Sequence, residues 1–351
     1  MKRLLRFFSH RSWGHTPGSP KLAVRMDITN RCNLLCKMCG YPSQARDPKS
    51  DMEPWLFEKI VREVFPYAEW ATLSCQYEPF MSAYFDEIIQ LAEKSPCPLG
   101  MTTNATLLTE RKSRMLLTHP TIKGVSVSID GACKETFERI RINARWDKFI
   151  ANLEQFAALR QELDPDRVFR LQFNTVLMKS TIGELPELVQ LCARLGATQL
   201  AAIRYVPINN QIDEQINDWE PYISTLICAK MLAHQYGIRL LLPLDDPRLR
   251  MADDSEEECS ANCARIGQYS QFCEAPWSGI QIYPNGDVHP CLFYGKSFGN
   301  LKTSSFLEIW NSQPYRELRK SLATMNLHPP CVHCNPHGYD NIEKKGRINT
   351  P

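Results

Sequence analysis

Three cysteines near the amino terminus have the spacing of ligands for an iron–sulfur cluster. Cys32, Cys36 and Cys39 follow a C-x3-C-x2-C pattern directly after an apolar stretch, Leu22–Met26, that is typical of a strand. Three thiolates on one short loop can hold three irons of a cubane cluster, which leaves the fourth iron open to a substrate or cofactor. A structural zinc site or three unrelated buried thiols are the alternatives, and the triplet alone does not decide between them.

A second set of cysteines near the carboxyl terminus could converge on one metal centre. Cys273 and Cys291 flank an expected hairpin, and Cys331 and Cys334 form a late C-x2-C pair, for which zinc again competes on spacing alone. Two further cysteines at C-x3-C spacing, Cys259 and Cys263, are interpreted as non-ligand thiols. The alternatives are that one of them replaces a ligand of the second set or that they form a further metal site. The remaining cysteines show no ligand spacing and are expected to be small buried hydrophobes: Cys75, Cys97, Cys133, Cys192 and Cys228.

The composition is that of an ordinary globular chain. Hydrophobic residues make up 43% and charged residues 23% of the 351 positions, and the formal net charge is +2, which gives no reason to expect a nucleic-acid or membrane partner. The basic first 15 residues lack the apolar core of a signal peptide, and no run of about 18 apolar residues occurs. The 14 cysteines cluster at metal-ligand spacings, which favours a reducing cytoplasm over a secreted disulfide framework.

Strand-like and helix-like segments alternate in the first two thirds of the chain. Strands are expected at 22–29, 70–74, 99–103, 124–129, 168–177 and 198–205. Helices are expected between them at 53–65, 84–94, 110–117, 134–163 and 183–195, the first with Ser50 or Asp51 as its cap and Pro54 in its first turn. The alternation predicts an α/β fold with a parallel sheet, barrel-like or doubly wound. In such sheets, sites gather at the carboxyl ends of the strands, where the first cysteine loop lies.

The pattern changes after this region. A helix at 222–236 and a strand at 238–242 are followed by an acidic stretch, 245–258, that is typical of a linker. Asn285-Gly286 predicts the turn of a hairpin between 279–283 and 287–290, and a helix is expected from Ser305, interrupted near Pro314. The predicted domains are a basic tail at 1–20, a barrel-like domain at 21–244, a linker at 245–272 and a small domain at 273–351.

Together these motifs resemble radical S-adenosylmethionine (SAM) enzymes with a carboxyl-terminal SPASM or twitch domain. The first cysteine loop matches the radical SAM part. A C-x-x-P-W entry, an N-G-D-V-x-P-C hairpin, a G-N-L run and an I-W-N helix, between Cys273 and Cys334, match the second part. The resemblance implies a partial (β/α)6 barrel with a small α+β domain. It further implies a 4Fe–4S cluster on Cys32, Cys36 and Cys39, with SAM on its open iron.

The resemblance also implies an auxiliary 4Fe–4S cluster in the small domain. Full SPASM domains carry additional cysteines between the hairpin and the terminal pair, but none occurs here between Cys291 and Cys331. The match is therefore to the shorter twitch form, with a single auxiliary cluster. Its implied ligands are Cys273, Cys291, Cys331 and Cys334.

Further positions match motifs that surround SAM in relatives. In the run Gln76-Tyr77-Glu78-Pro79, Glu78 stands where a carboxylate receives the SAM amino group, and Gln76 and Tyr77 replace two glycines. The resemblance implies contacts to the ribose, carboxylate or adenine of SAM at several further positions. These are Asn104 in T-N-A, where Ala105 replaces the glycine of the family pattern, Ser128 and Asp130 in S-x-D-G, Arg141 one helix later, and Met38 beside the third cysteine. Taken singly, strand-end capping, a surface ion pair or core packing would explain each of them.

Arg204 and Tyr205 lie near the carboxyl end of the sixth expected strand. They face either the mouth of the barrel or the outer helices. In the first case they would contact the substrate, and they are the candidate catalytic-site residues outside the cofactor motifs. The second case would make them packing residues.

The resemblance implies that the first cluster cleaves SAM to a 5′-deoxyadenosyl radical, which abstracts a hydrogen atom from the substrate. A fully ligated auxiliary cluster suits electron transfer, and the twitch form is similar to the dehydrogenase of butirosin biosynthesis. The leading hypothesis is therefore oxidation of a small hydroxylated metabolite. Radical oxidation, crosslinking or epimerisation of a peptide or protein is the alternative, as in sulfatase-maturating enzymes, and an iron–sulfur or zinc scaffold is the non-enzymatic one. A flavodoxin- or ferredoxin-like electron donor is the implied protein partner.

Overall fold

The computed structural model describes residues 22–207, 213–244, 246–249, 273, 275–324 and 326–332. The predicted amino-terminal tail, most of the predicted linker and three of the cysteines singled out above therefore lie outside the described residues: Cys259, Cys263 and Cys334. No helix in the described ranges is long and apolar enough to cross a membrane.

Strands β1–β7 form a parallel sheet in sequence order, and the carboxyl-terminal hairpin extends the same sheet. Within the described residues the strand order is β10-β9-β8-β1-β2-β3-β4-β5-β6-β7. β8 pairs with β1 in parallel, whereas β9 and β10 pair in antiparallel fashion. This confirms an α/β partial barrel with a small α+β region. The strands are β1 Leu22–Met26, β2 Ala68–Thr72, β3 Leu99–Thr103, β4 Ile122–Ser128, β5 Arg170–Leu177, β6 Gln199–Arg204, β7 Arg239–Leu241, β8 Gly279–Ile282, β9 Asp287–His289 and β10 Gly299–Asn300.

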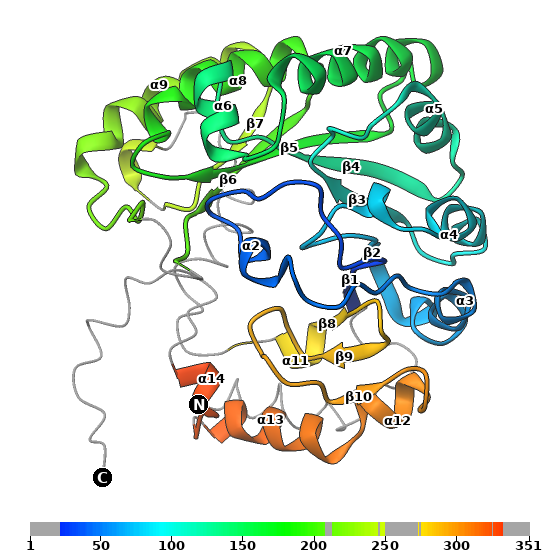
Figure 1. Ribbon diagram of the computed structural model, residues 1–351. Helices are drawn as coiled ribbons and strands as arrows, with labels where there is room; N and C mark the ends of the chain where they lie inside the picture. The colour runs from blue at the N-terminus through cyan, green and yellow to red at the C-terminus, as the bar shows by residue number, and fades with distance from the viewer. Residues whose placement is uncertain are drawn as a thin grey trace.

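The connecting helices cover the outer, convex face of the curved sheet (Figure 1). Their apolar residues recur at helical spacing: α7 buries Phe149, Leu153 and Phe156, and α4 buries Phe85, Ile88 and Ala92. The helices are α3 Pro54–Glu63, α4 Phe85–Ala92, α5 Glu110–Thr118, α6 Lys134–Ile140, α7 Trp146–Leu163, α8 Leu185–Arg194 and α9 Ile223–Gln235. Short helical turns join them: α2 Tyr41–Gln44, η1 Phe65–Tyr67, η2 Pro79–Met81, η3 Ile182–Glu184, η4 Glu220–Tyr222 and η5 Pro247–Leu249.

Two expectations about helices are wrong in detail. The cap of α3 is neither Ser50 nor Asp51, because the helix begins at Pro54 and Glu53 stands before it without a side-chain cap. Asp51 instead forms an ion pair with Arg31 at 3.1 Å, beside the loop after β1. The single helix expected at 134–163 is divided into α6 and α7, and its first part ends at Arg141, which has φ −96° and ψ 72°.

The expectation of small buried thiols holds for Cys97 and Cys192, and Cys75 is half-buried. It is wrong for Cys133 and Cys228, which are exposed. Cys133 stands before the first residue of α6, and Cys228 lies on α9 away from the face that packs against the core.

The helices of the small domain pack around a buried arginine, and its apolar residues are continuous with the core of the barrel. These helices are α11 Ala275–Ser278, α12 Phe306–Trp310, α13 Gln313–Thr324 and α14 Pro329–Val332. The helical segment that begins after Ser305 is interrupted near Pro314, as predicted, and Pro314 lies in the first turn of α13. Arg319 is 2% exposed, and its guanidinium lies 4.3 Å from the ring of Trp310 and 4.9 Å from that of Tyr315. It donates to the carbonyl of Pro276 at 2.9 Å, so one side chain joins α11, α12 and α13.

The small domain packs against the first helix of the barrel. Lys59 on α3 donates to the carbonyls of Leu301 at 2.7 Å and Ser304 at 2.9 Å. The N–H group of Phe306 donates to Glu63 Oε2 at 3.2 Å, and the Phe306 ring lies 5.6 Å from that of Tyr67. These contacts and the β1–β8 pairing fix the position of the small domain on the barrel.

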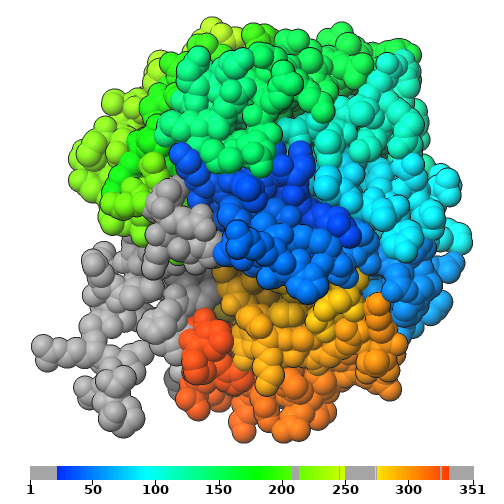
Figure 2. All heavy atoms as spheres, in the orientation of Figure 1, coloured from blue at the N-terminus to red at the C-terminus, as the bar shows by residue number. Residues whose placement is uncertain are grey.

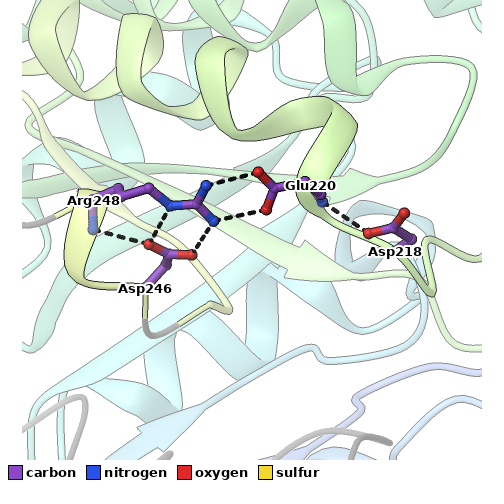
Figure 3. A network of polar contacts seen from close by, with 4 residues as sticks. All are labelled: Asp218, Glu220, Asp246 and Arg248. Carbon is purple, nitrogen blue, oxygen red and sulfur yellow. Dashed lines mark hydrogen bonds and ion pairs between the residues drawn. The ribbon is translucent and has the colours of Figure 1, made fainter.

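At the other end of the sheet, η5 packs against the start of α9. Arg248 is bonded to Glu220 and to Asp246, and the N–H group of Glu220 donates to Asp218 (Figure 3). These charges lie at the surface, so water and salt screen them and the network adds little stability. Leu249, at 5% exposure, provides the buried apolar contact of η5.

Replacement of Gly131 by alanine should destabilise the protein. The added Cβ would lie 2.6 Å from the Phe137 backbone nitrogen in α6, and a backbone atom cannot be relieved by a rotamer change. We expect a loss of about 1–3 kcal/mol, measured as a lower midpoint of urea unfolding. Gly183→Ala is the matched control, because nothing lies within 4 Å of its added Cβ. Equal midpoints for the two variants would contradict this packing.

Candidate functional site

The loop that carries Cys32, Cys36 and Cys39 follows β1 at the carboxyl edge of the sheet. Figure 2 shows this amino-terminal segment, in blue, on the surface between the barrel and the small domain. The N–H groups of Leu35 and Lys37 donate to carbonyls at the end of α6, each at 3.0 Å, and the N–H group of Cys39 donates to the carbonyl of Cys36 at 3.1 Å. All three cysteines are half-buried. The end of α6 therefore sets the path of the cysteine loop.

Each of these three sulfurs has a nitrogen donor nearby. Arg141 Nη1 lies 3.9 Å from the sulfur of Cys36, Asn104 Nδ2 lies 3.9 Å from that of Cys32, and the N–H group of Tyr41 lies 3.4 Å from that of Cys39. Burial raises the pKa of Cys32 to about 11 and that of Cys36 to about 12. A metal centre would favour the ionised form of these thiols at neutral pH, and the three donors would then stabilise the ligated sulfurs. This donor set fits an iron–sulfur cluster.

No group of three or more cysteine, histidine or acidic residues converges as ligands of one metal ion within the described part of the chain. A cubane cluster does not need such convergence, because each cysteine binds a different iron. The loop is thus compatible with the cluster that its spacing predicts.

Arg141 joins the cysteine loop to the end of β4. It is 5% exposed, and its Nη2 lies 2.5 Å from Asp130 Oδ2. Burial alone would lower the pKa of Arg141, but Asp130 and then Cys36 hold it above its usual value. Asp130 also accepts the N–H group of Val176 at 2.7 Å. The Nε atom of Arg141 is buried without a hydrogen-bond partner among the described residues, so one donor remains available in this site.

Glu78 joins the segment after β2 to the end of β3. It is 1% exposed and accepts hydrogen bonds from Asn104 N at 2.8 Å, Thr103 Oγ1 at 2.8 Å and Phe80 N at 3.3 Å. Burial raises the pKa of Glu78 to about 7. A carboxylate has about four acceptor positions, so three donors leave capacity for one more. Whether the SAM ammonium is that donor stays a prediction.

Asn104 connects the Glu78 segment to the first cysteine. Its side chain donates to Asn33 Oδ1 at 2.9 Å and accepts from Thr106 Oγ1 at 2.6 Å, and Asn33 is adjacent to Cys32. The next residue, Ala105, has φ 57°, a left-handed conformation that glycine adopts more easily. Alanine thus occupies, with some strain, a position where the resemblance expects glycine.

Two of the predicted site residues, Met38 and Tyr205, lie in one apolar cluster, whereas Tyr77 lies apart from them. Met38 and Val176 pack against a small cluster of Tyr205, Ile140 and Met178, so the structure brings Met38 and Tyr205 together near the cysteine loop. Tyr77 lies further out: its hydroxyl donates to Gln44 Oε1 at 3.0 Å, and burial raises its pKa.

Arg204 lies at the carboxyl end of β6, beside a small cavity. Its guanidinium lies 5.0 Å from the ring of Trp219, and its Nε donates to the carbonyl of Pro243 at 3.2 Å. The cavity has a volume of about 20 Å³, enough for about one water molecule, and Tyr205, Gln215 and other side chains also line it. Arg204 is therefore in contact with the outer elements, on the same side of β6 as the buried Leu200 and Ala202.

A row of polar side chains crosses the concave face of the sheet. The registers align Thr102, Ser126, Gln172 and Gln199 on β3–β6. Gln199 Nε2 donates to Gln172 Oε1 at 2.7 Å, and Gln172 Nε2 donates to Asn174 Oδ1 at 2.6 Å. Their sequence neighbours are buried under the helices on the other face, as strand alternation requires. Ser128 pairs with Asn174 one layer nearer the carboxyl edge. The concave face therefore presents hydroxyl and amide groups.

The second set of cysteines lies in the small domain. Cys273, Cys291 and Cys331 are half-buried, and Cys334 lies outside the described residues. The pKa of Tyr294 is raised by burial and then by the charge of the ionised Cys331 and Cys291 thiols. These two cysteines therefore lie near the same tyrosine. The Tyr294 hydroxyl lies 2.8 Å from His328 Nδ1.

Sequence reasoning missed Asp27, Gln281 and Asn33. Asp27 is fully buried at the end of β1, and burial raises its pKa to about 6. The signal that could have identified it is a carboxylate at the carboxyl end of a buried strand, five residues before Cys32. No comparable signal marks Gln281, whose partner is distant in the sequence.

Comparisons with known proteins agree with this geometry. A radical SAM superfamily model matches residues 26–197, and a model of the SPASM iron–sulfur cluster-binding domain matches residues 273–335. A "Tungsten-containing aldehyde ferredoxin oxidoreductase cofactor-modifying protein" from Pyrococcus furiosus is 26% identical over 325 residues, which are 88% of this chain and 86% of the relative.

Two solved structures show the same fold at low identity. Streptococcus suis SuiB bound to precursor peptide SuiA has a TM-score of 0.67 at 16% identity, and the match covers 93% of this chain and 74% of SuiB. BtrN in complex with AdoMet and 2-DOIA has a TM-score of 0.50 at 14% identity, and the match covers 91% of this chain and 96% of BtrN.

The two matched ranges contain the two sets of cysteines: the loop after β1 falls in the first and the hairpin region in the second. Their cofactors are accordingly SAM and iron–sulfur clusters. The chain therefore belongs to the radical SAM superfamily and is a radical SAM enzyme with a carboxyl-terminal SPASM domain.

Proposed function

We propose that this enzyme oxidises a small hydroxylated metabolite, with an auxiliary 4Fe–4S cluster in the small domain as electron acceptor. The observation that carries the proposal is the row of Thr102, Ser126, Gln172 and Gln199 on the concave face of the barrel. These side chains are uncharged and both donate and accept hydrogen bonds, which complements the hydroxyl groups of a polyol. They lie on the concave face of the sheet, and the cysteine loop lies at the carboxyl edge of the same sheet.

The first cluster site would be formed by Cys32, Cys36 and Cys39. When bound there, the cluster and SAM supply the 5′-deoxyadenosyl radical that removes a hydrogen atom from the substrate. Arg141 and Asn104 would donate toward the ligated sulfurs from the 3.9 Å positions that they hold. The free Nε–H of Arg141 would bind the SAM carboxylate, and Glu78 would accept the SAM ammonium.

The other site residues would shape the binding pocket. Ser128 and Asp130, at the carboxyl end of β4, would lie near the SAM ribose, with Met38 packed near the adenine and Tyr77 at the outer edge. Tyr205 contacts the apolar cluster that includes Met38, so it would exclude water where SAM and substrate meet. Arg204 would contact the substrate from β6.

The auxiliary cluster would be held by Cys273, Cys291, Cys331 and Cys334. Four protein ligands leave no iron open, which suits electron transfer rather than substrate binding. A flavodoxin- or ferredoxin-like protein would supply the electron for SAM cleavage, and a reducing cytoplasm would preserve the thiols. BtrN, solved in complex with AdoMet and 2-DOIA, matches 91% of this chain, which supports a small-molecule substrate.

A peptide substrate is the second candidate, since SuiB was solved with its precursor peptide and matches this fold. Deuterium transfer separates the two substrate classes. We expect 5′-deoxyadenosine to gain deuterium from a panel of carbon-deuterated polyols and aminocyclitols, and none from deuterated peptides. Transfer from peptides alone would reject the metabolite proposal.

Anaerobic reconstitution should give about eight irons per chain if each of the two sites holds a 4Fe–4S cluster. Cys36→Ala should lose about four of them and abolish 5′-deoxyadenosine formation, whereas Cys291→Ala should lose about four and still cleave SAM. Cys192→Ala is the control, because this thiol is buried under the sheet away from both sites. A wild-type content of about four irons would contradict the second cluster.

Glu78→Gln should weaken SAM binding and flatten its pH dependence. Because burial raises the pKa of Glu78 to about 7, the carboxylate is protonated below that pH and no longer pairs with the ammonium. The SAM dissociation constant of the wild type should rise as pH falls below 7, by up to about tenfold per pH unit. Glu87→Gln, on the exposed side of α4, is the control. Unchanged affinity in Glu78→Gln would remove Glu78 from the SAM site.

A further inference from the structure

Asp27 connects three strands at the carboxyl edge of the sheet. The residue follows β1, is 0% exposed, and its Oδ1 accepts the N–H groups of Cys75 at 2.8 Å and Gln76 at 2.9 Å. Its Oδ2 accepts from Gln281 Nε2 on β8 at 2.9 Å. Its own N–H group donates to the carbonyl of Ile282, also on β8, at 3.0 Å. One carboxylate thus holds both the segment after β2 and the first strand of the small domain.

A second hydrogen bond runs between the same two segments. Gln76 Nε2 donates to the hydroxyl of Tyr283 at 3.2 Å, directly after β8. Gln76 stands where the resemblance expects a glycine, which has no side chain that could reach the small domain. The side chain of Gln76 therefore forms a hydrogen bond between the barrel and the small domain.

We propose that Asp27, Gln281 and Tyr283 are positioning residues that hold the Cys75–Glu78 segment for SAM and couple SAM binding to the small domain. The inference rests on the proposed function only in placing that segment at the SAM site. The bonds on Asp27 orient the backbone that leads to Glu78. Removal of Gln281 would take the side-chain donor from Asp27 Oδ2, and a buried carboxylate that loses a donor is costly enough to move the segment.

The coupling must act in both directions. If the small domain holds the Cys75–Glu78 segment in the form that binds SAM, bound SAM must in turn stabilise the contacts to β8. Hydrogen exchange detects both effects, because the N–H groups of Cys75 and Gln76 are the donors to Asp27 and exchange when those bonds open.

The first experiment compares Gln281→Met, Tyr283→Phe and the wild type, each reconstituted anaerobically. Without SAM, we expect faster amide exchange in residues 73–78 of both variants. With SAM, the wild type should gain protection in 73–78 and in 279–289, and Gln281→Met should lose most of the gain in 279–289. The SAM dissociation constant of Gln281→Met should rise about tenfold at unchanged iron content. Gln90→Met, exposed on α4, is the matched control.

A reciprocal exchange separates positioning from general damage. Gln281→Glu alone places two buried carboxyl groups against each other and should weaken SAM binding. Adding Asp27→Asn restores one donor and one acceptor at this contact. The amide nitrogen introduced at position 27 would donate to the carboxylate introduced at position 281, while the amide oxygen would still accept the N–H groups of Cys75 and Gln76. We expect the double variant to recover most of the affinity.

The outcomes distinguish this inference from the proposed function. Wild-type exchange at 73–78 in both Gln281→Met and Tyr283→Phe would overturn the positioning role, even if the enzyme cleaves SAM. No recovery in the double variant would also overturn it. Failure of the wild type to bind SAM would instead reject the proposed SAM site, because exchange at Cys75 and Gln76 can be measured without SAM. If Gln281→Met does not fold, Tyr283→Phe removes only one hydroxyl and still tests the contact.

Discussion

At the carboxyl edge of a parallel sheet the ladder of backbone hydrogen bonds ends, and the amides of the loops that follow need other acceptors. Three buried carboxylates supply them in this protein. Asp27, Glu78 and Asp130 are each at most 1% exposed, and each accepts an N–H group from a neighbouring strand or its loop. Their partners, in the same order, are the amides of Cys75 and Gln76, of Asn104, and of Val176. Each carboxylate thereby holds together two segments that are distant in the sequence.

The cysteine loop depends on this edge. Asn104 is bonded to Glu78 and lies beside the sulfur of Cys32, and Arg141 is bonded to Asp130 and lies beside the sulfur of Cys36. The two donors that approach these sulfurs are thus themselves fixed by buried carboxylates. Burial of a carboxylate has a free-energy cost, which hydrogen bonds from backbone amides offset here. Backbone amides cannot rotate away from the carboxylate, whereas side-chain donors can.

Sequence reasoning predicts the order of the elements well, because strands with alternating burial and amphipathic helices have distinct periods. It also predicts the cysteine loop, since its spacing is local. It misses the break between α6 and α7, where Asn143 adopts a left-handed conformation with φ 73° and the buried Arg141 pairs with Asp130. It also misses the contact between Asp27 and Gln281, because they are 254 positions apart and meet only where β8 pairs with β1.

That strand pairing also determines how the two sets of cysteines are related. The first set follows the carboxyl end of β1, whereas Cys273 precedes β8 and Cys291 follows the antiparallel strand β9, so both lie toward the amino end of β8. The two sets therefore lie toward opposite ends of β8, which has four residues and spans about 13 Å. A linker would leave this spacing variable, but a continuous sheet holds it constant. The position of the small domain is thus a property of the sheet, and the Asp27 contacts lie where its two parts meet.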